Sequence, residues 1–109
     1  MARHVWTPGV TKHFVSRAVE RLGCSEDEAR ELGQGLIWAI KEERWDLVRL
    51  VGRVNRAGHR VFKFRHAPTK RYRYALVNTA QMVCITILRP GRDVRRQGKS
   101  RLNLKEDDL

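Results

Sequence analysis

Between positions 47 and 92 the sequence has no Asp or Glu, although the same 46 residues include eleven Lys and Arg. The flanking segments are nearly neutral: residues 1–46 hold seven basic and eight acidic residues, and residues 93–109 hold five and four. The formal net charge of +11 therefore comes almost entirely from the middle segment. A surface that serves only solubility mixes both signs, so this segment predicts a negatively charged partner. RNA or another polyanion fits best.

Other residue types are too scarce or too scattered for several classes of site. The two cysteines, Cys24 and Cys84, and the four histidines include no close pair with the spacing of a structural zinc site. Gly33 and Gly35 fall inside a predicted helix and lack the Lys-Ser/Thr ending of a phosphate-binding loop. We therefore expect no metal and no cofactor.

Long apolar runs are also missing. No stretch approaches the roughly 18 apolar residues needed to cross a bilayer, and the first ten residues lack the apolar core of a secretory signal. The basic residues fall mainly in strand-like sequence rather than on an amphipathic helix, which argues against a membrane-surface partner. We expect a cytoplasmic protein.

At 109 residues with 41% hydrophobic residues, the chain is long enough for one domain and too short for two. We expect an N-terminal arm over residues 1–10, a single domain over 11–90 and a flexible charged tail over 91–109. The tail follows Pro90 and begins with Gly91, has few large apolar residues and passes from basic to acidic.

Two helices are predicted in the first half of this domain. Apolar residues recur three or four apart from Thr11 to Leu22, and Gly23 ends that pattern. Ser25 and Glu28 have the spacing of a capping box, so a second helix should begin there and run to about Glu43. The tryptophans that flank its apolar positions, Trp38 and Trp45, are expected to pack in the core.

Strands are predicted in the second half. Residues 45–54 fit both helical and strand spacing, and we favour a strand. Three further strands are expected at His59–Arg65, Arg71–Val77 and Met82–Leu88, separated by turn-like residues. The predicted fold is α+β, with two N-terminal helices packed on one face of a three- or four-stranded antiparallel sheet.

The register of the strands decides which side chains share a face. A three-residue loop at 67–69 would set Phe64 opposite Tyr72 and Phe62 opposite Tyr74, which makes one apolar face for the helices to cover. Thr86 and Cys84 would then lie on the other face. A four-residue loop would instead set Phe64 opposite Arg73. The three-residue loop gives the more continuous apolar face and is the one we expect.

The opposite face of the sheet is then basic. Its predicted nucleic-acid-binding residues are Lys63, Arg65, Arg71, Arg73, Arg49 and Arg53, and Arg17 would extend the surface from the first helix. Lys63–Arg73 and Arg65–Arg71 would be like-charge pairs, which a bound polyanion would compensate.

The first helix contains His13, Arg17 and Arg21 in a His-x3-Arg-x3-Arg pattern, followed by a short break and the Ser25-capped acidic helix start. This pattern resembles small bacterial and phage domains of RelE and ParE toxin-like fold. The resemblance covers roughly residues 11–88. It implies two helices on a small antiparallel sheet, RNA as substrate, metal-independent cleavage by a toxin-type endoribonuclease, and an acidic protein partner or antitoxin.

Cleavage through the RNA 2′-hydroxyl needs a group that accepts its proton and cations that stabilise the phosphorane. His59 has the strand parity of Lys63 and Arg65 and is the candidate general base. Two interpretations from other classes stay open: a non-catalytic phage-type inhibitor or adaptor that occupies the nucleic-acid site of a host complex, and a sequence-independent DNA-binding protein.

Overall fold

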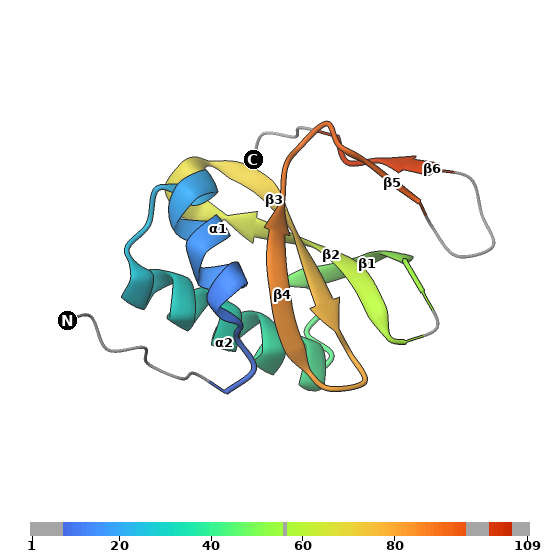
Figure 1. The fold of residues 1–109 in the computed structure, drawn as a ribbon, viewed down its shortest axis with the longest axis horizontal. Coiled ribbons are helices and arrows are strands. Elements are labelled where there is room, and N and C mark those ends of the chain that lie inside the picture. Colours follow the sequence, from blue (N-terminus) through green and yellow to red (C-terminus); the bar gives the residue numbers. More distant parts are fainter. Residues whose placement is uncertain (1–7, 56, 96–100, 106–109) are drawn as a thin grey trace.

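The computed structural model describes residues 8–55, 57–95 and 101–105. It has an α+β fold in which two helices precede a four-stranded antiparallel sheet, as the sequence predicts (Figure 1). The elements are α1 Lys12–Leu22, α2 Glu26–Lys41, β1 Val48–Arg53, β2 His59–His66, β3 Arg71–Asn78, β4 Val83–Leu88, β5 Asp93–Arg95 and β6 Arg101–Asn103. The predicted N-terminal arm lies outside the described residues up to position 7.

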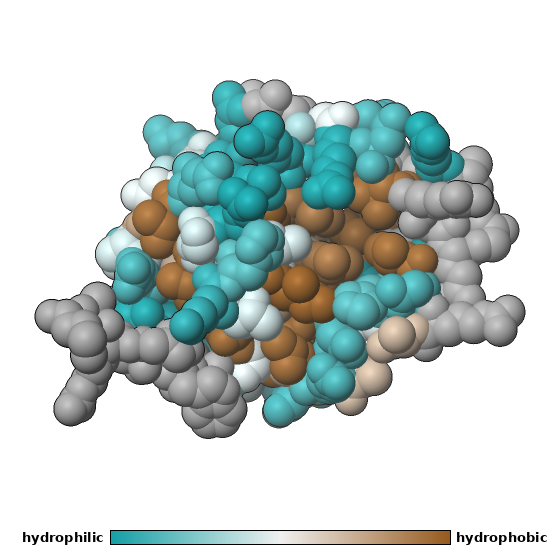
Figure 2. Space-filling view, in the orientation of Figure 1, coloured by the Kyte–Doolittle hydropathy of each residue, from teal (hydrophilic) through white to brown (hydrophobic). Residues whose placement is uncertain are grey.

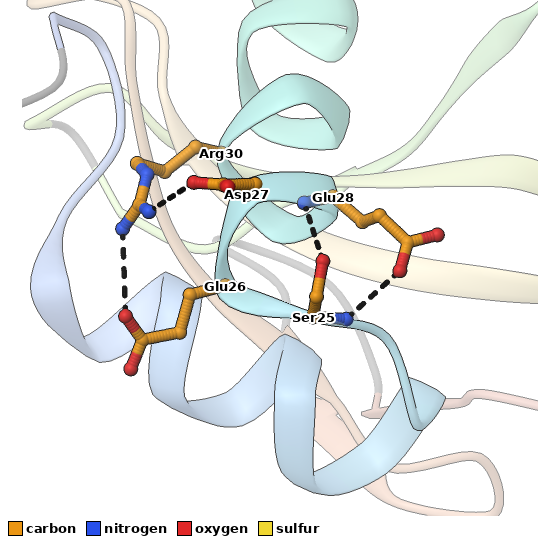
Figure 3. A network of polar contacts seen from close by, with 5 residues as sticks. All are labelled: Ser25, Glu26, Asp27, Glu28 and Arg30. Atoms are coloured by element: carbon orange, nitrogen blue, oxygen red, sulfur yellow. Dashed lines mark hydrogen bonds and ion pairs between the residues drawn. The ribbon is translucent and has the colours of Figure 1, made fainter.

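Both helices begin with side-chain caps. The Thr11 hydroxyl accepts a hydrogen bond from the Phe14 backbone N–H at 3.0 Å, and α1 ends at Gly23, whose φ of 70° suits glycine. At α2 the predicted capping box is present (Figure 3): the Glu28 N–H donates to Ser25 Oγ at 3.1 Å, and the Ser25 N–H donates to Glu28 Oε1 at 3.0 Å. These reciprocal bonds fix the start of α2.

The sheet order is β1-β2-β3-β4, and each strand is antiparallel to its neighbour. The ambiguous segment 45–54 therefore contains a strand, as favoured. A bulge between Leu50 and Gly52 interrupts its pairing with β2.

The predicted register between β2 and β3 is wrong by one residue. Phe64 lies opposite Arg73 and Arg65 opposite Tyr72, with His66 and Arg71 as the last pair. The physical reason is the connection, which has four residues: the 3-10 turn Ala67–Thr69 is followed by Lys70 in the left-handed region, with φ 54°. Lys70 closes this turn, its N–H donating to the Ala67 carbonyl at 3.0 Å.

The shifted register exchanges the faces of every β3 side chain. Tyr72 and Tyr74, predicted in the helix-covered core, lie on the outer face with Lys63 and Arg65. Arg71 and Arg73, predicted on the outer face, share the helix-facing side with Phe64 and Phe62. The bulge in β1 also sets Arg53 opposite Arg60, which shares the helix-facing side with Phe62. Three of the seven predicted binding residues, Arg53, Arg71 and Arg73, are therefore on the wrong face, and two aromatic residues join the outer face. The β3–β4 register differs too, so that buried Cys84 packs on the helix side opposite Val77.

The helix-facing core is closely packed. Phe14, Ala18 and Ala29 are fully buried, and they pack with Phe62 and Phe64 in one cluster. Gly33 lies inside α2 where a Cβ atom would come within 2.6 Å of Val10 Cγ2 and 3.1 Å of the Phe14 ring. Glycine at this position therefore lets α2 approach the segment that leads into α1.

A second, smaller core lies on the outer face. It consists of Val61, Tyr74, Leu88 and Leu104, with Leu104 fully buried. The Tyr74 hydroxyl donates to the Lys105 carbonyl at 2.9 Å, and the Leu104 N–H donates to the Arg92 carbonyl at 2.8 Å. Figure 2 shows brown apolar surface bordered by teal right of the centre, in the region between the main sheet and the hairpin β5–β6.

Two described parts of the predicted tail, residues 91–95 and 101–105, have regular structure. They include the hairpin β5–β6, and Leu104 anchors them to the sheet. The reason is that alternating residues of β2 and β3 leave an apolar patch on the outer face, which Leu104 covers. The flexibility of the rest stays a prediction.

The prediction that Trp38 and Trp45 pack in the core is wrong, since they are 49% and 50% exposed. No helix in the described part of the chain is long and apolar enough to cross a bilayer.

Candidate nucleic-acid interface

The outer face carries a row of cations and aromatic rings across three neighbouring strands. Arg49 of β1 lies opposite Lys63 of β2, Lys63 lies opposite Tyr74 of β3, and Arg65 lies opposite Tyr72. All five positions lie toward the β2–β3 turn. The predicted binding residues Lys63, Arg65 and Arg49 are therefore brought together, as expected from their parity.

Lys63 is held at the centre of this row. Its ammonium nitrogen lies 4.6 Å from the centroid of the Tyr72 ring and 5.9 Å from that of Tyr74. Cation–π attraction of this kind contributes about 0.5–1 kcal/mol at exposed sites. It restricts the long Lys63 side chain to the middle of the face. Arg65, by contrast, is exposed.

The two tyrosines differ in what they can offer a ligand. Tyr74 is buried, 4% exposed, and its hydroxyl is bonded to Lys105, so it serves the second core. Tyr72 is half-buried and closer to Lys63, so part of its ring is open to solvent. Both tyrosines were predicted on the other face, because a loop one residue shorter than the observed one reverses the faces of β3.

Arg71 and Arg73 form a second group around the β2–β3 turn, on the helix side. The Arg73 Nε donates to the Thr69 hydroxyl at 3.2 Å, and the same hydroxyl lies 2.8 Å from His66 Nδ1. Burial, and then the charge of Arg71, lowers the pKa of Arg73. Although Arg65 and Arg73 lie on opposite faces, both belong to the strand ends that this turn joins.

His66, rather than His59, is the histidine that the structure places beside an arginine of this group. Burial and the charge of Arg73 lower the pKa of His66, while Glu28 opposes that shift. The imidazole is therefore neutral near pH 7.

His59 lies at the other end of β2, with its Nδ1 2.8 Å from Asn55 Nδ2 and 3.0 Å from Asn55 Oδ1. His59 and Arg65 are six positions apart, or about 20 Å along a strand. His59 and Arg65 therefore do not meet at one phosphate. The catalytic role of His59 stays a prediction.

The remaining predicted residues lie elsewhere. Arg53 is opposite Arg60 at the far end of β1, away from the β2–β3 turn. Arg17 is on α1 and forms an ion pair with Glu20 at 2.7 Å. It belongs to a third basic group at the junction of α1 and the end of β4, where Arg21 donates to the Ile87 carbonyl. Burial first, and then Arg17, Arg89 and Arg92, lower the pKa of Arg21.

Other reactive groups do not join these sites. Burial raises the pKa of the Cys84 thiol to about 12, so the thiol is protonated at neutral pH and is a poor nucleophile. Within the described ranges, no group of three His, Cys, Asp or Glu could hold a metal ion.

No protein-family model, no curated protein and no solved structure matches this chain. The resemblance to RelE and ParE toxin-like domains therefore stays a prediction.

Proposed function

We propose that this protein binds RNA through the outer face of its sheet, in the cytoplasm, as a small domain of RelE-like architecture. The observation that carries the proposal is the row formed by Arg49, Lys63 and Arg65 beside the half-buried ring of Tyr72. Cations along a surface attract the phosphate backbone, and an aromatic ring offers a platform on which an unpaired base stacks. This combination favours single-stranded RNA over a duplex.

The acid-free sequence supports the same proposal. The described ion pairs of Arg17, Arg30 and Arg44 all use carboxylates that lie outside positions 47–92. Arg65 and Arg49 are exposed, so a phosphate can reach both guanidinium groups without a change in the fold.

Binding of a fluorescent single-stranded RNA at increasing salt tests the proposal. If about five phosphates are neutralised, log K should fall against log salt with a slope of about −3 to −4. A flat dependence, or no binding in low salt, would exclude nucleic acid as the partner. The same oligonucleotide made as DNA tests the DNA-binding alternative.

Variants separate the two kinds of contact. Lys63→Ala and Arg65→Ala should each weaken binding and reduce the salt slope by about 0.7. Tyr72→Ala should cost about 1–3 kcal/mol of stacking and leave the slope unchanged. Arg30→Ala is the matched control, because Arg30 is paired with Glu26 and Asp27 on α2 and should leave binding as it is.

Cleavage is a separate question from binding. Incubation of the protein with RNA in chelator, followed by gel analysis, distinguishes a toxin-type ribonuclease from a binder. Discrete fragments that disappear in His59→Ala would support the catalytic prediction. Tight binding that leaves RNA whole would favour the inhibitor or adaptor alternative.

A further inference from the structure

Four large apolar side chains, all between positions 38 and 50, are exposed. Trp38 is 49% exposed, Trp45 50%, Leu47 45% and Leu50 44%. They come from α2, from the turn after it and from β1. Isolated exposed apolar residues are common, but a group of this size usually marks an interaction surface.

The turn between α2 and β1 holds the end of the helix and the start of the strand, which carry these side chains, close together. The Arg44 N–H donates to the Ala39 carbonyl at 2.8 Å, and the Arg44 carbonyl accepts from Leu47 at 2.9 Å and Val48 at 3.1 Å. The Arg44 guanidinium lies 5.5 Å from the centroid of the Trp38 ring. The turn is therefore folded back on the end of α2, directly beside the start of β1.

This region lies along an open edge of the sheet. β1 is the first strand in the order β1-β2-β3-β4, and among the described strands it is bonded to β2 alone. At this edge the Val48 N–H already donates to the Arg44 carbonyl, and the backbone groups beyond it along β1 can pair with another strand.

We propose that β1 pairs antiparallel with β1 of a second copy of this chain, about a two-fold axis. The two four-stranded sheets would then form one continuous sheet, and the exposed Trp and Leu side chains would be buried at the junction. This inference does not depend on RNA binding. It would place the two outer faces side by side.

Charge complementarity favours a second copy as the occupant. In a two-fold antiparallel pair, the start of each strand lies opposite the end of its partner. Residues 42–47, just before β1, contain three carboxylates (Glu42, Glu43 and Asp46) and one guanidinium, whereas β1 itself carries Arg49 and Arg53. The acidic turn of each copy would therefore lie near Arg53 at the end of the other copy's β1, whereas Arg49 would lie closer to the two-fold axis.

Sedimentation velocity of the full chain over a range of concentrations tests the proposal. We expect a monomer–dimer equilibrium. Leu50→Asp and Arg53→Glu should each weaken dimerisation by about tenfold or more, a cost of about 1.4 kcal/mol. The matched control is Arg65→Glu, which makes the same change in charge on β2, away from the open edge, and should leave the equilibrium unchanged.

A double charge-reversal variant and amide hydrogen exchange of β1 test the proposal further. Adding Glu42→Arg to Arg53→Glu should restore dimerisation, and no restoration would overturn the charge pairing. In the wild-type protein, β1 amides should exchange more slowly at high concentration than at low concentration. Because it uses the wild-type protein, this measurement still tests the proposal if a variant fails to fold. A monomer at every concentration, equal weakening by Arg65→Glu, or unchanged β1 exchange would overturn the proposal.

Discussion

The two faces of the sheet use alternate residues of the same strands, yet they are covered in different ways. On one side Phe62 and Phe64 pack under both helices, in a core with fully buried Phe14. On the other side a small core around Tyr74 is covered by Leu104. Lys63 and Arg65 lie beyond that cover. The outer face therefore combines an apolar patch that stabilises the fold with a charged patch that is open to solvent.

Truncation of an aromatic side chain should destabilise the fold more on the helix-facing side of the sheet than on the outer face. Phe64→Ala should destabilise the fold by about 3–5 kcal/mol in urea unfolding, because it leaves a cavity under both helices. Tyr72→Ala, on the outer face, is the matched aromatic truncation and should cost clearly less. Equal losses would mean that Tyr72 is a core residue and that the predicted three-residue loop was right.

The smaller core should respond to loss of its cover. Leu104→Ala should cost about 2–4 kcal/mol if the C-terminal segment is docked as described. Tyr74→Phe, which removes only the hydrogen bond to Lys105, should cost about 0.5–1.5 kcal/mol. If the urea midpoint of Leu104→Ala equals that of the wild type, the outer face has no core of its own.

In the charged part of the outer face, replacement of a side chain by Ala should raise the stability of the fold rather than lower it. Arg49 lies directly opposite Lys63, so Arg49→Ala should raise stability by up to about 1 kcal/mol by removing a like-charge pair. Arg65 lies opposite Tyr72, and Arg65→Ala should bring no such gain. Thermal melts in low salt measure the difference in stability between Arg49→Ala and Arg65→Ala, and added salt should diminish this difference. A gain for Arg65 alone would favour the pairing with Arg71 that the three-residue loop implied.

The smallest effect we expect is a pH dependence of folding stability that comes from His66, on the helix-facing side of the sheet. Because burial and Arg73 lower the pKa of His66, the unfolded chain binds more protons than the folded one as pH falls through about 6.5. The contribution of His66 to stability is therefore fully present above that pH and is lost on acidification.

Urea midpoints at about pH 7.5 and 5.5 measure this loss. His66→Gln should reduce it, whereas replacement of the exposed His13 should not. A dependence that persists unchanged in His66→Gln would assign it to another group.

Local sequence was sufficient where the determining interactions are local. The capping box at Ser25 and the end of α1 at Gly23 depend on residues within one turn of each other, and both were predicted. The Thr11 cap is equally local, although it was not predicted. The strands were also recognisable, since alternation and turn residues are short-range signals.

The candidate site was predicted only in part. Arg49, Lys63 and Arg65 share a face because of their spacing on β1 and β2, and their parity was available from the sequence. Tyr72, Arg71 and Arg73 were assigned to the wrong faces, because their position depends on the length of a loop rather than on a pattern within β3.

The sequence by itself determined the order of helices and strands, the acid-free basic segment and the helix caps. Only the tertiary structure decided which face each β3 side chain occupies, because Lys70 in the left-handed region adds one residue to the connection. It also decided that Leu104 covers the outer face and that Trp38 and Trp45 remain exposed. Those outcomes depend on which distant surfaces meet, and no pattern within one segment contains that information.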